Sequence, residues 1–387
     1  MKKPIVLFFF VMFVIGTDTF LVSPLLPMLQ VQYHVDVNQS GWIVSAYALG
    51  YAIFALIAGP ISDQFDRKKV MMYGMIAFSL TTFLCGIAPT FFFMLLFRFL
   101  AGVSAAFVTP QVWASIPSLV SSNQILKSIG IASSGLAISQ MLGLPIGSYF
   151  ASFYWSVPFF VLCFCSLLLV VGIRLLPSIR SISSPSKSSF LHTYQHVFQK
   201  PGARKLLFAY FLFQMGNFAA FSFFGMWLHE DFHLSVTKIG VALLVLGAGN
   251  LCGSVLGPAI VKKVGSRLFL AVGLLSLAIL YMILPLSSSL FIVEGMLFVI
   301  YFLTGILFPI MMNMMQGISV SARGTIAALS NTFMYGGTMI GSAAAAYLYK
   351  MSSTFSTVTL FTSVFFIISF FLFHHHGKTT SEVRATV

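Results

Sequence analysis

Two residues of opposite charge stand alone inside long apolar stretches and could carry out proton chemistry together. Asp18 lies in the sequence VIGTDTFLVSPLLP, residues 14–27, and no other ionisable side chain occurs between residues 4 and 29. Arg98 interrupts a second apolar stretch. A carboxyl group that alternates between apolar surroundings and the vicinity of a cation can bind and release a proton. The same carboxylate can bind a cationic substrate in competition with the proton. The alternative is a protonated aspartic acid that hydrogen-bonds between helices.

The composition indicates that lipid surrounds most of this chain. Of its 387 residues, 58% are hydrophobic and only 7% are charged, and the mean hydropathy is +0.98. A soluble protein of this length could not cover its surface with so few charges. A helix needs about 20 apolar residues to cross the hydrocarbon core. We predict an all-α integral membrane protein with twelve spans, at 4–29, 41–61, 70–88, 91–113, 127–151, 157–176, 205–228, 239–261, 267–286, 289–312, 324–349 and 355–373.

The net charge of +13 is distributed as expected for a membrane protein with both termini in the cytoplasm. With that orientation, eighteen of the 21 lysines and arginines fall on the cytoplasmic side, and only Lys238 and Lys350 fall outside. This asymmetry follows the positive-inside rule, so the basic charge is explained by topology and not by nucleic-acid binding. All four cysteines lie in predicted spans, which favours apolar packing over disulfides or metal ligation.

The longest polar stretch, residues 177–204, divides the spans into two sets of six. Its serines, prolines and basic residues are typical of a cytoplasmic linker, and we expect a short interfacial helix around 190–199. The predicted units are an N-terminal half at 1–176, this linker, a C-terminal half at 205–373 and a cytoplasmic tail at 374–387.

The two halves contain similar segments, LGYAIFALIAGPISDQFDRKKV at 49–70 and LGAGNLCGSVLGPAIVKKVGSRLFL at 246–270. Each is a glycine-studded helix with Gly-Pro near its inner end, followed by a basic loop. Paired six-span repeats are typical of secondary transporters, whose substrate site lies between the halves near the bilayer midplane. The alternative is a chance similarity between two basic loops.

The segment GPISDQFDRKK, residues 59–69, resembles the loop between spans 2 and 3 of the major facilitator superfamily. That loop has a glycine, an aspartate four residues later and then clustered basic residues. Asp66 stands where the family usually has glycine. The matching positions in this sequence are Gly59, Asp63, Arg67 and Lys68.

This resemblance implies a conformational gate on the cytoplasmic side. Asp63 can face the positive N-terminal end of span 11, near Arg323. The contact would join the halves only while the cytoplasmic side is closed, and it would favour the outward-facing state. Members of the family often hold the basic residues with an acid at the inner end of span 4, but residues 114–126 contain no acid. The alternative is a basic loop that only sets topology.

Three further segments resemble motifs of this superfamily. Arg98, with Gly102 and nearby alanines, matches the fourth-helix motif, and a charge there must face a partner or a polar cavity. Asp18, followed by two prolines, resembles the first helix of twelve-span drug/proton antiporters, and it lies about 21 Å along its helix, near the membrane middle. The fifth span resembles the glycine-proline motif of antiporters, although such a helix could also signal only close packing or a kink. The matching positions of the fifth span are Gly135, Gly143, Pro145 and Gly147.

Scattered polar and aromatic side chains in the spans could line a roomy apolar pocket. For each of them, hydrogen bonding between helices is the alternative. Glu294 is the only other acid in a span, where it either contacts a cationic substrate or reaches the interface. Glu230 and Asp231 should belong to a solvated external loop. The candidate cavity residues are Gln111, Gln140, Tyr210, Gln214, Asn217, Phe221, Glu294 and Asn331, with Asn250 as a further amide.

The resemblance covers essentially the whole chain and implies a proton-coupled efflux antiporter for lipophilic or weakly cationic molecules. The alternatives are an exporter of a small metabolite, such as a sugar, nucleoside or amino-acid derivative, and a proton symporter for uptake. The sequence has no nucleotide-binding loop or metal-ligand cluster, so we expect neither an enzyme nor a cofactor. We expect a monomer in the bacterial plasma membrane that binds a small-molecule substrate and protons.

Overall fold

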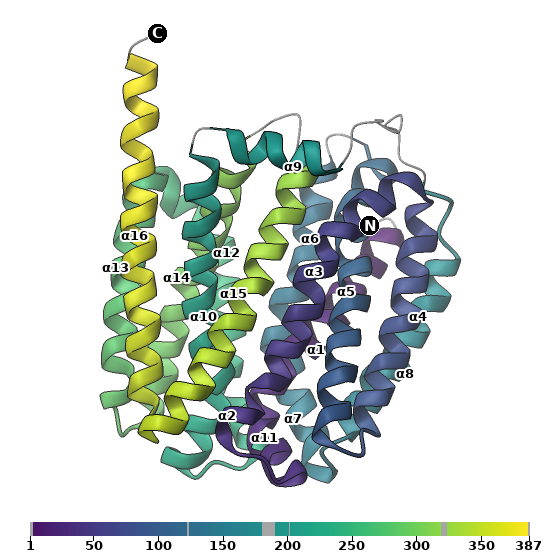
Figure 1. Ribbon diagram of the computed structural model, residues 1–387, viewed down its shortest axis with the longest axis vertical. Coiled ribbons are helices and arrows are strands. Elements are labelled where there is room, and N and C mark those ends of the chain that lie inside the picture. The colour runs from purple at the N-terminus through teal and green to yellow at the C-terminus, as the bar shows by residue number, and fades with distance from the viewer. Residues whose placement is uncertain (1–2, 122–123, 180–189, 201, 319–322, 386–387) are drawn as a thin grey trace.

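The computed structural model describes residues 3–121, 124–179, 190–200, 202–318 and 323–385. Within these residues the chain forms helices and connecting turns, with no strand. Figure 1 shows the helices standing side by side, with those of the first half on one side and those of the second half on the other. Both termini lie at one end of the bundle, called here the terminal end; the opposite end is the far end.

The described helices of the first half are α1 (Lys3–Tyr33), α2 (Val37–Ser40), α3 (Trp42–Gln64), α4 (Arg67–Gly86), α5 (Phe91–Leu119), α6 (Ile125–Ile138), the π-helical turn η2 (Ser139–Gly143), α7 (Leu144–Phe153) and α8 (Val157–Arg174). The helix α9 (Phe190–Gln199) follows in the segment predicted as the linker, where a short helix was expected, and lies across the terminal end (Figure 1).

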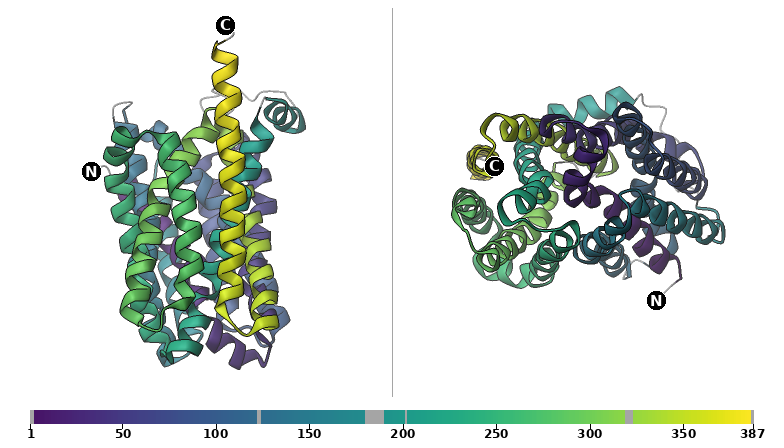
Figure 2. Two further views of the ribbon diagram at one scale, coloured as in Figure 1. Left: turned by 90° about the vertical axis from the view of Figure 1, so that its left-hand side faces the viewer. Right: turned by 90° about the horizontal axis from the view of Figure 1, so that it is seen from below.

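The described helices of the second half are α10 (Ala203–Phe232), α11 (Val236–Ala242), α12 (Leu244–Val264), α13 (Ser266–Ile283), the 3₁₀ turn η3 (Leu284–Leu286), α14 (Leu290–Gln316), α15 (Arg323–Ser352) and α16 (Phe355–Ala385). The last helix rises beyond the bundle at the terminal end (Figure 2, left).

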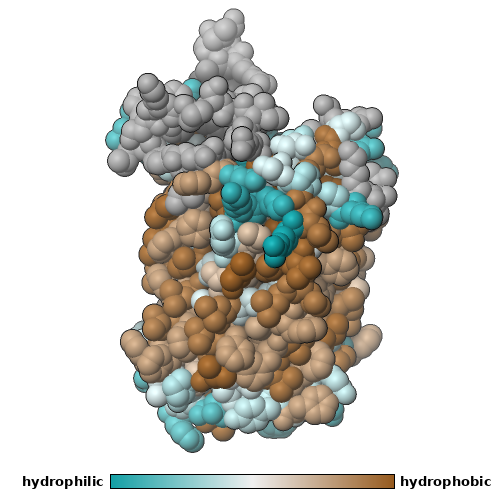
Figure 3. Space-filling view, turned by 90° about the vertical axis from the view of Figure 1, so that its right-hand side faces the viewer, coloured by the Kyte–Doolittle hydropathy of each residue, from teal (hydrophilic) through white to brown (hydrophobic). Residues whose placement is uncertain are grey.

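The helices coincide with the predicted spans to within a few residues at most boundaries. Eleven helical segments of the described residues are long and apolar enough to cross a membrane. The twelfth predicted span, 324–349, corresponds to α15, which packs between α10 and α3. Figure 3 shows the apolar belt that these helices expose, with more polar residues at the far end. The prediction of twelve membrane helices in two halves is confirmed.

Local sequence signals explain several helix boundaries. Asp36 caps α2 by accepting the main-chain N–H of Gln39, whose side chain returns the bond in a capping box. The π-helical turn η2 ends just before Pro145. Proline has no N–H to donate to the preceding turn, so the helix widens there. The predicted fifth span therefore contains a break in its regular hydrogen bonding.

One expectation about the far end was wrong. Glu230 and Asp231 belong to the last turn of α10, not to an external loop. Asp231 accepts a hydrogen bond from the indole of Trp227 at 2.9 Å, and Glu230 accepts one from the hydroxyl of Tyr349. These partners let the helix continue past the apolar stretch that set the predicted boundary.

The two halves meet along several helix pairs, which Figure 2 (right) shows end-on. α1 packs on α10, where Ser23 donates a hydrogen bond to the carbonyl of Phe221. α3 packs on α15, where the hydroxyls of Ser45 and Ser342 lie 2.7 Å apart. α7 packs on α11, and η2 packs on α12. The contact surface between the halves is where a shared site can form.

Candidate functional site

The two isolated charges of the sequence form an ion pair inside the first half. Asp18 is on α1 and Arg98 is on α5, and Oδ2 of Asp18 lies 2.9 Å from Nη1 of Arg98. The exposed fractions of the two side chains are 0% and 1%. A buried charge requires a partner. Because each residue supplies that partner for the other, both charges are tolerated in this apolar interior.

The pair retains unused hydrogen-bonding capacity. Within the described residues, Oδ1 of Asp18 and Nε of Arg98 have no hydrogen-bond partner. A buried polar atom without a partner raises the free energy of the state that contains it. The free carboxylate oxygen of Asp18 is therefore a position where a proton can bind.

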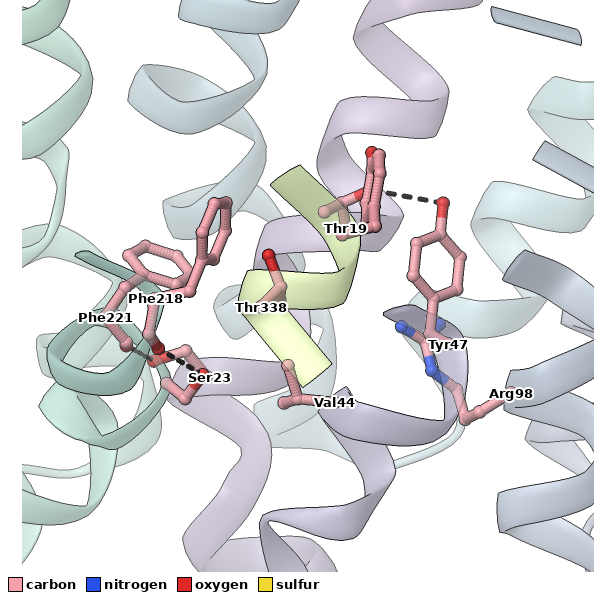
Figure 4. Close-up of a pocket in the computed structure, with 10 residues that line it drawn as sticks. Thr19, Ser23, Val44, Tyr47, Arg98, Phe218, Phe221 and Thr338 are labelled. Carbon is pink, nitrogen blue, oxygen red and sulfur yellow. Dashed lines mark hydrogen bonds between the residues drawn. The ribbon is translucent and has the colours of Figure 1, made fainter. Parts of the chain in front are cut away.

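Tyr47 of α3 covers the guanidinium of Arg98. Cζ of Arg98 lies 4.5 Å from the ring centroid, a cation–π contact. The hydroxyl oxygen of Tyr47 lies 3.2 Å from Oγ1 of Thr19 (Figure 4). Arg98 thus contacts a carboxylate from α1 and an aromatic face from α3, so its position depends on both helices.

A small cavity lies between the halves beside Arg98 (Figure 4). Its volume is about 10 Å³, enough to hold the centre of about one water molecule. The substrate of a transporter would need a wider state of the same site. The lining residues are Thr19, Ser23, Val44, Tyr47, Arg98, Phe218, Phe221, Ser222, Tyr335 and Thr338, from α1, α3, α5, α10 and α15.

Hydroxyl groups in the cavity wall offer oxygen lone pairs more readily than hydrogens. Ser23 donates its hydrogen to the carbonyl of Phe221, Ser222 to that of Phe218 and Thr338 to that of Met334. The hydroxyl of Thr19 lies 2.9 Å from the carbonyl oxygen of Ile15, which can accept its hydrogen. A serine or threonine has one hydrogen and two lone pairs. The wall therefore presents acceptor oxygens between aromatic faces.

Three tyrosines were not singled out by the sequence reasoning: Tyr47 and Tyr335 of the cavity wall, and Tyr51 beside it. Tyr51 of α3 stacks on Tyr335 of α15, with ring centroids 3.7 Å apart and an angle of 20°. Tyr47 lies 6.3 Å from Tyr335 between centroids. The spacing of Tyr47 and Tyr51, four residues apart on one helix, was a visible signal, but the partner from α15 was not.

The amides and other predicted cavity residues have varied surroundings. Nδ2 of Asn250 donates to Oε1 of Gln140 at 3.0 Å, which links α12 to η2. Gln214 donates to the hydroxyl of Tyr210 at 2.7 Å. Both side-chain polar atoms of Gln111 are buried without a hydrogen-bond partner within the described residues.

Of the eight candidate cavity residues, Phe221 alone is in the cavity wall described above. Asn217 is buried on α10, with its Oδ1 unpaired among the described atoms, while Glu294 on α14 and Asn331 on α15 are half-buried. Their roles in substrate binding stay predictions.

The predicted gate is only partly within the described side chains. Gly59, Asp63 and Arg323 lie in α3 and α15, but their side chains are outside the described residues. Arg67 donates a hydrogen bond to the main-chain carbonyl of Ala114, and Lys68 donates one to that of Leu176. Arg67 thus bonds to a main-chain carbonyl of α5, in a segment, residues 114–126, that contains no acid.

Asp66, which replaces the family's usual glycine, has a defined structural role. Its carboxylate accepts hydrogen bonds from the main-chain N–H groups of Lys68 and Ile179 and from the hydroxyl of Ser178. The first bond caps α4. The other two attach the chain that follows α8 to the loop between α3 and α4.

The antiporter-like glycines hold the fifth span against α1. A Cβ atom added to Gly135 would lie 2.3 Å from the carbonyl oxygen of Phe9, and one added to Gly143 would lie 2.4 Å from Oγ1 of Thr17. Gly147 would clash with Leu21 in the same way. Small residues permit such close helix contact. With Pro145 at the π-helical turn, these glycines support the helix that carries Asp18.

Within the described residues, no group of three or more histidine, cysteine, aspartate or glutamate side chains could hold a metal ion. The four cysteines are free thiols, buried or half-buried in the helices.

The sequence and the fold match known transporters. A model of the Major Facilitator Superfamily matches residues 8–335 and 206–385. The uncharacterized MFS-type transporter YceJ of Bacillus subtilis (strain 168) is 55% identical over 383 residues, which are 98% of each chain. The quinolone resistance protein NorA of Staphylococcus aureus is 24% identical over 91% of each chain.

Among solved structures, a D-xylose-proton symporter superimposes with a TM-score of 0.82 over 96% of each chain, at 13% identity. This similarity shows the fold. Because the family model and a relative of 55% identity both extend over nearly the whole sequence, the chain belongs to the Major Facilitator Superfamily of membrane transporters.

Proposed function

We propose that this protein exports lipophilic, weakly cationic small molecules in exchange for protons, by alternating access. The observation that carries the proposal is the position of Arg98, which pairs with Asp18 on one side and lines the cavity between the halves on the other. A change of charge at Asp18 therefore acts on the cavity through one side chain.

The coupling follows from the charge of the pair. While Asp18 is ionised, the pair is neutral and a cation can occupy the cavity. A proton that enters from outside neutralises Asp18 and leaves the charge of Arg98 uncompensated. At a separation of about 6 Å and an effective dielectric constant near 20, two like charges repel by about 3 kcal/mol, or roughly 100-fold in affinity. The substrate leaves on the outside, and release of the proton to the cytoplasm restores the site.

In this scheme the proton and the substrate compete through Arg98. The sequence alone led us to expect direct competition at Asp18, but the Asp18 carboxylate lies behind Arg98 and is not part of the cavity wall.

The cavity wall supports a cationic, aromatic substrate. Phe218, Phe221 and Tyr335 offer aromatic faces, which attract organic cations. The hydroxyls of Ser222 and Thr338 present lone pairs suited to the N–H groups of a protonated amine. The name of the relative NorA, a quinolone resistance protein, and the antiporter-like glycines of the fifth span are in keeping with drug efflux.

The same proposal includes location and gating. Eighteen basic residues on one side support an orientation with both termini in the cytoplasm of a bacterial cell and the far end outside. The protein works as a monomer, since one chain supplies both halves of the cavity. Asp63, at the terminal end of α3, holds the start of α15 while the cytoplasmic side is closed, and Arg67 and Lys68 support that loop.

Transport in everted membrane vesicles tests the proposal. We expect a lipophilic cation to cause proton movement in vesicles with the wild-type protein, and we expect the conservative variant Asp18→Asn to abolish it. Asp231→Asn is a matched control, because Asp231 is an acid in the last turn of α10 that is not in the described cavity wall and whose bond from Trp227 the amide oxygen can still accept. Normal coupled transport by Asp18→Asn would overturn the mechanism.

The hydroxyl content of the wall favours a second candidate, export of a small hydroxylated metabolite by the same alternating access. Six of the ten lining residues carry a hydroxyl group. A deletion strain separates the candidates: drug efflux predicts increased sensitivity to toxic cations, whereas metabolite export predicts intracellular accumulation of one compound with unchanged sensitivity.

A further inference from the structure

Three tyrosines join the two halves next to the cavity. Tyr47 and Tyr51 come from α3 of the first half, and Tyr335 comes from α15 of the second half. Their exposed fractions are 2%, 1% and 7%, so the contact is shielded from solvent. The centroid distance of 3.7 Å between Tyr51 and Tyr335 is the shortest of the ring contacts in the described part of the chain. We refer to these residues as the tyrosine cluster.

The stacked pair lies on the terminal side of the cavity. At 1.5 Å per residue, Tyr51 and Tyr335 lie about 18–20 Å from the terminal ends of their helices, whereas Val44 and Thr338 of the cavity wall lie about 22–30 Å away. The next contact in that direction is the hydrogen bond from Thr332 to the carbonyl of Ala52, at 3.2 Å. The stacked rings therefore form a floor between the cavity and the terminal end.

The cluster is also connected to the ion pair. The ring of Tyr47 contacts the guanidinium of Arg98 on one side and lies near Tyr335 on the other. The charged and titratable groups that face Asp18 are Arg98, Tyr47 and Cys85. Those that face Tyr335 are Tyr47, Tyr51 and Tyr210. The only route of aromatic contacts from the ion pair to α15 in the described residues thus passes through Tyr47.

We infer that Tyr335 is a positioning residue that closes the terminal side of the cavity and transmits the state of the Asp18–Arg98 pair to the second half. The inference rests on the proposed proton coupling and adds the residues that connect it to the gate. With the pair intact, Arg98 holds the ring of Tyr47, and this favours the closed stack. When a proton neutralises Asp18, Arg98 loses its partner and Tyr47 loses a fixed cation, so the ratio of open to closed stacks rises.

The direction of this response fits the transport cycle. A protonated carrier must open toward the cytoplasm to release its proton there, whereas the deprotonated carrier with bound substrate must keep that side closed. The observed structure has the ion pair formed and the tyrosines stacked, which is the combination expected for the closed terminal side.

The test measures the opening of each end as a function of pH. In the full-length protein with the four native cysteines replaced, spin labels at Lys69 and Lys263, both exposed on opposite halves, report the terminal end. Labels at Ser152 and Ser288, also exposed, report the far end. Distance distributions are recorded in lipid nanodiscs between pH 5 and 9, without substrate.

We expect Tyr335→Leu to raise the ratio of open to closed terminal ends about 2- to 12-fold, as loss of one aromatic stack would, and to flatten its pH dependence. Tyr335→Phe keeps the ring and should restore both. Phe366→Leu removes a stack within the second half, with Phe213 at 5.1 Å, and should leave the pH profile unchanged. If Tyr335→Leu does not fold, Tyr51→Leu removes the same stack from the other side.

The outcomes separate the two proposals. Suppose that the wild-type distances change with pH and that Asp18→Asn removes this change. If Tyr335→Leu then behaves like the wild type, the tyrosine inference is wrong, whereas proton coupling stands. A Tyr335→Phe variant as defective as Tyr335→Leu would also overturn the inference, because the ring would not be the active feature. The proposed function itself would be overturned if the wild-type distances did not change with pH and the substrate caused no proton movement in the vesicles.

Discussion

Arg98 is shared between a carboxylate and an aromatic face, and this explains why arginine suits the position. One Nη atom bonds to Asp18 while the flat guanidinium lies against Tyr47. Lysine has a compact ammonium group with no planar surface and could not make both contacts in the same way. The two contacts hold the charge at the edge of the cavity.

The balance of charge in this pair leads to a prediction about stability. Arg98→Gln leaves Asp18 buried without its cation, so we expect the unfolding free energy to fall by about 3–5 kcal/mol. Adding Asp18→Asn removes the uncompensated group, and most of this loss should be recovered. Thermal unfolding of the purified single and double variants in detergent measures both effects. A double variant no more stable than Arg98→Gln would show that the pair is not the source of the loss.

At the scale of helices, the position of Asp18 depends on how closely the fifth span approaches α1. Glycines at three positions along the fifth span face Phe9, Thr17 and Leu21, on both sides of Asp18. The π-helical turn between them places Gln140 against Asn250 of the other half. The glycine-proline motif therefore serves close packing, and that packing connects the helix that carries Asp18 to the interface between the halves.

Two alanine substitutions in the same helix test this packing. In Gly135→Ala, the new Cβ meets the main-chain oxygen of Phe9, which cannot move by a rotamer change, so α1 and α6 must separate. We expect a loss of about 1–3 kcal/mol and a shifted pH midpoint for substrate-dependent proton movement. Gly130→Ala meets nothing within 4 Å and is the control. Equal stability and equal midpoints for the two variants would refute the packing role.

At the scale of the whole molecule, the sequence predicted the architecture well because span formation depends on local composition. A window of about 20 apolar residues with few charges identifies a membrane helix without knowledge of its neighbours. For this reason even α15, the least apolar of the twelve helices by this measure, was located within three residues. The error at Glu230 and Asp231 arose because the partner of Glu230, Tyr349, is 119 residues away in the chain and becomes visible only after folding.

The site was less predictable because its residues meet across the chain. Hydropathy marked Asp18 and Arg98 as costly charges, and the requirement for a partner correctly suggested their proximity. No local pattern could join Tyr51 to Tyr335, or attach Ile179 to Asp66. These contacts depend on which helix faces lie together, and a single sequence does not specify that arrangement.

An ion pair joins the two halves at the far end, as the tyrosine cluster joins them on the terminal side of the cavity. Lys350, at the end of α15, lies 2.6 Å from Oδ2 of Asp36, next to α2. The hydrogen bond from Lys350, aided by the N–H of Gln39, lowers the pKa of Asp36 below its usual value. Opening the far end separates the pair, so the lowered pKa belongs to the far-end-closed state.

The pair stabilises the closed far end fully at pH values above the ordinary aspartate pKa, near 4. This contribution is lost as the pH falls toward the lowered pKa of Asp36. We expect a change from pH 6 to about 3.5 to increase the ratio of open to closed far ends by up to about 3-fold, a small effect because the exposed pair is screened by solvent and salt. The measurement uses the Ser152 and Ser288 labels in the Asp18→Asn background, which removes the titration proposed for Asp18. Lys350→Gln should abolish the response, and 1 M salt should weaken it. A response that persists in Lys350→Gln would assign the pH dependence to another group, because closing the far end would then lower the pKa of a carboxyl other than Asp36.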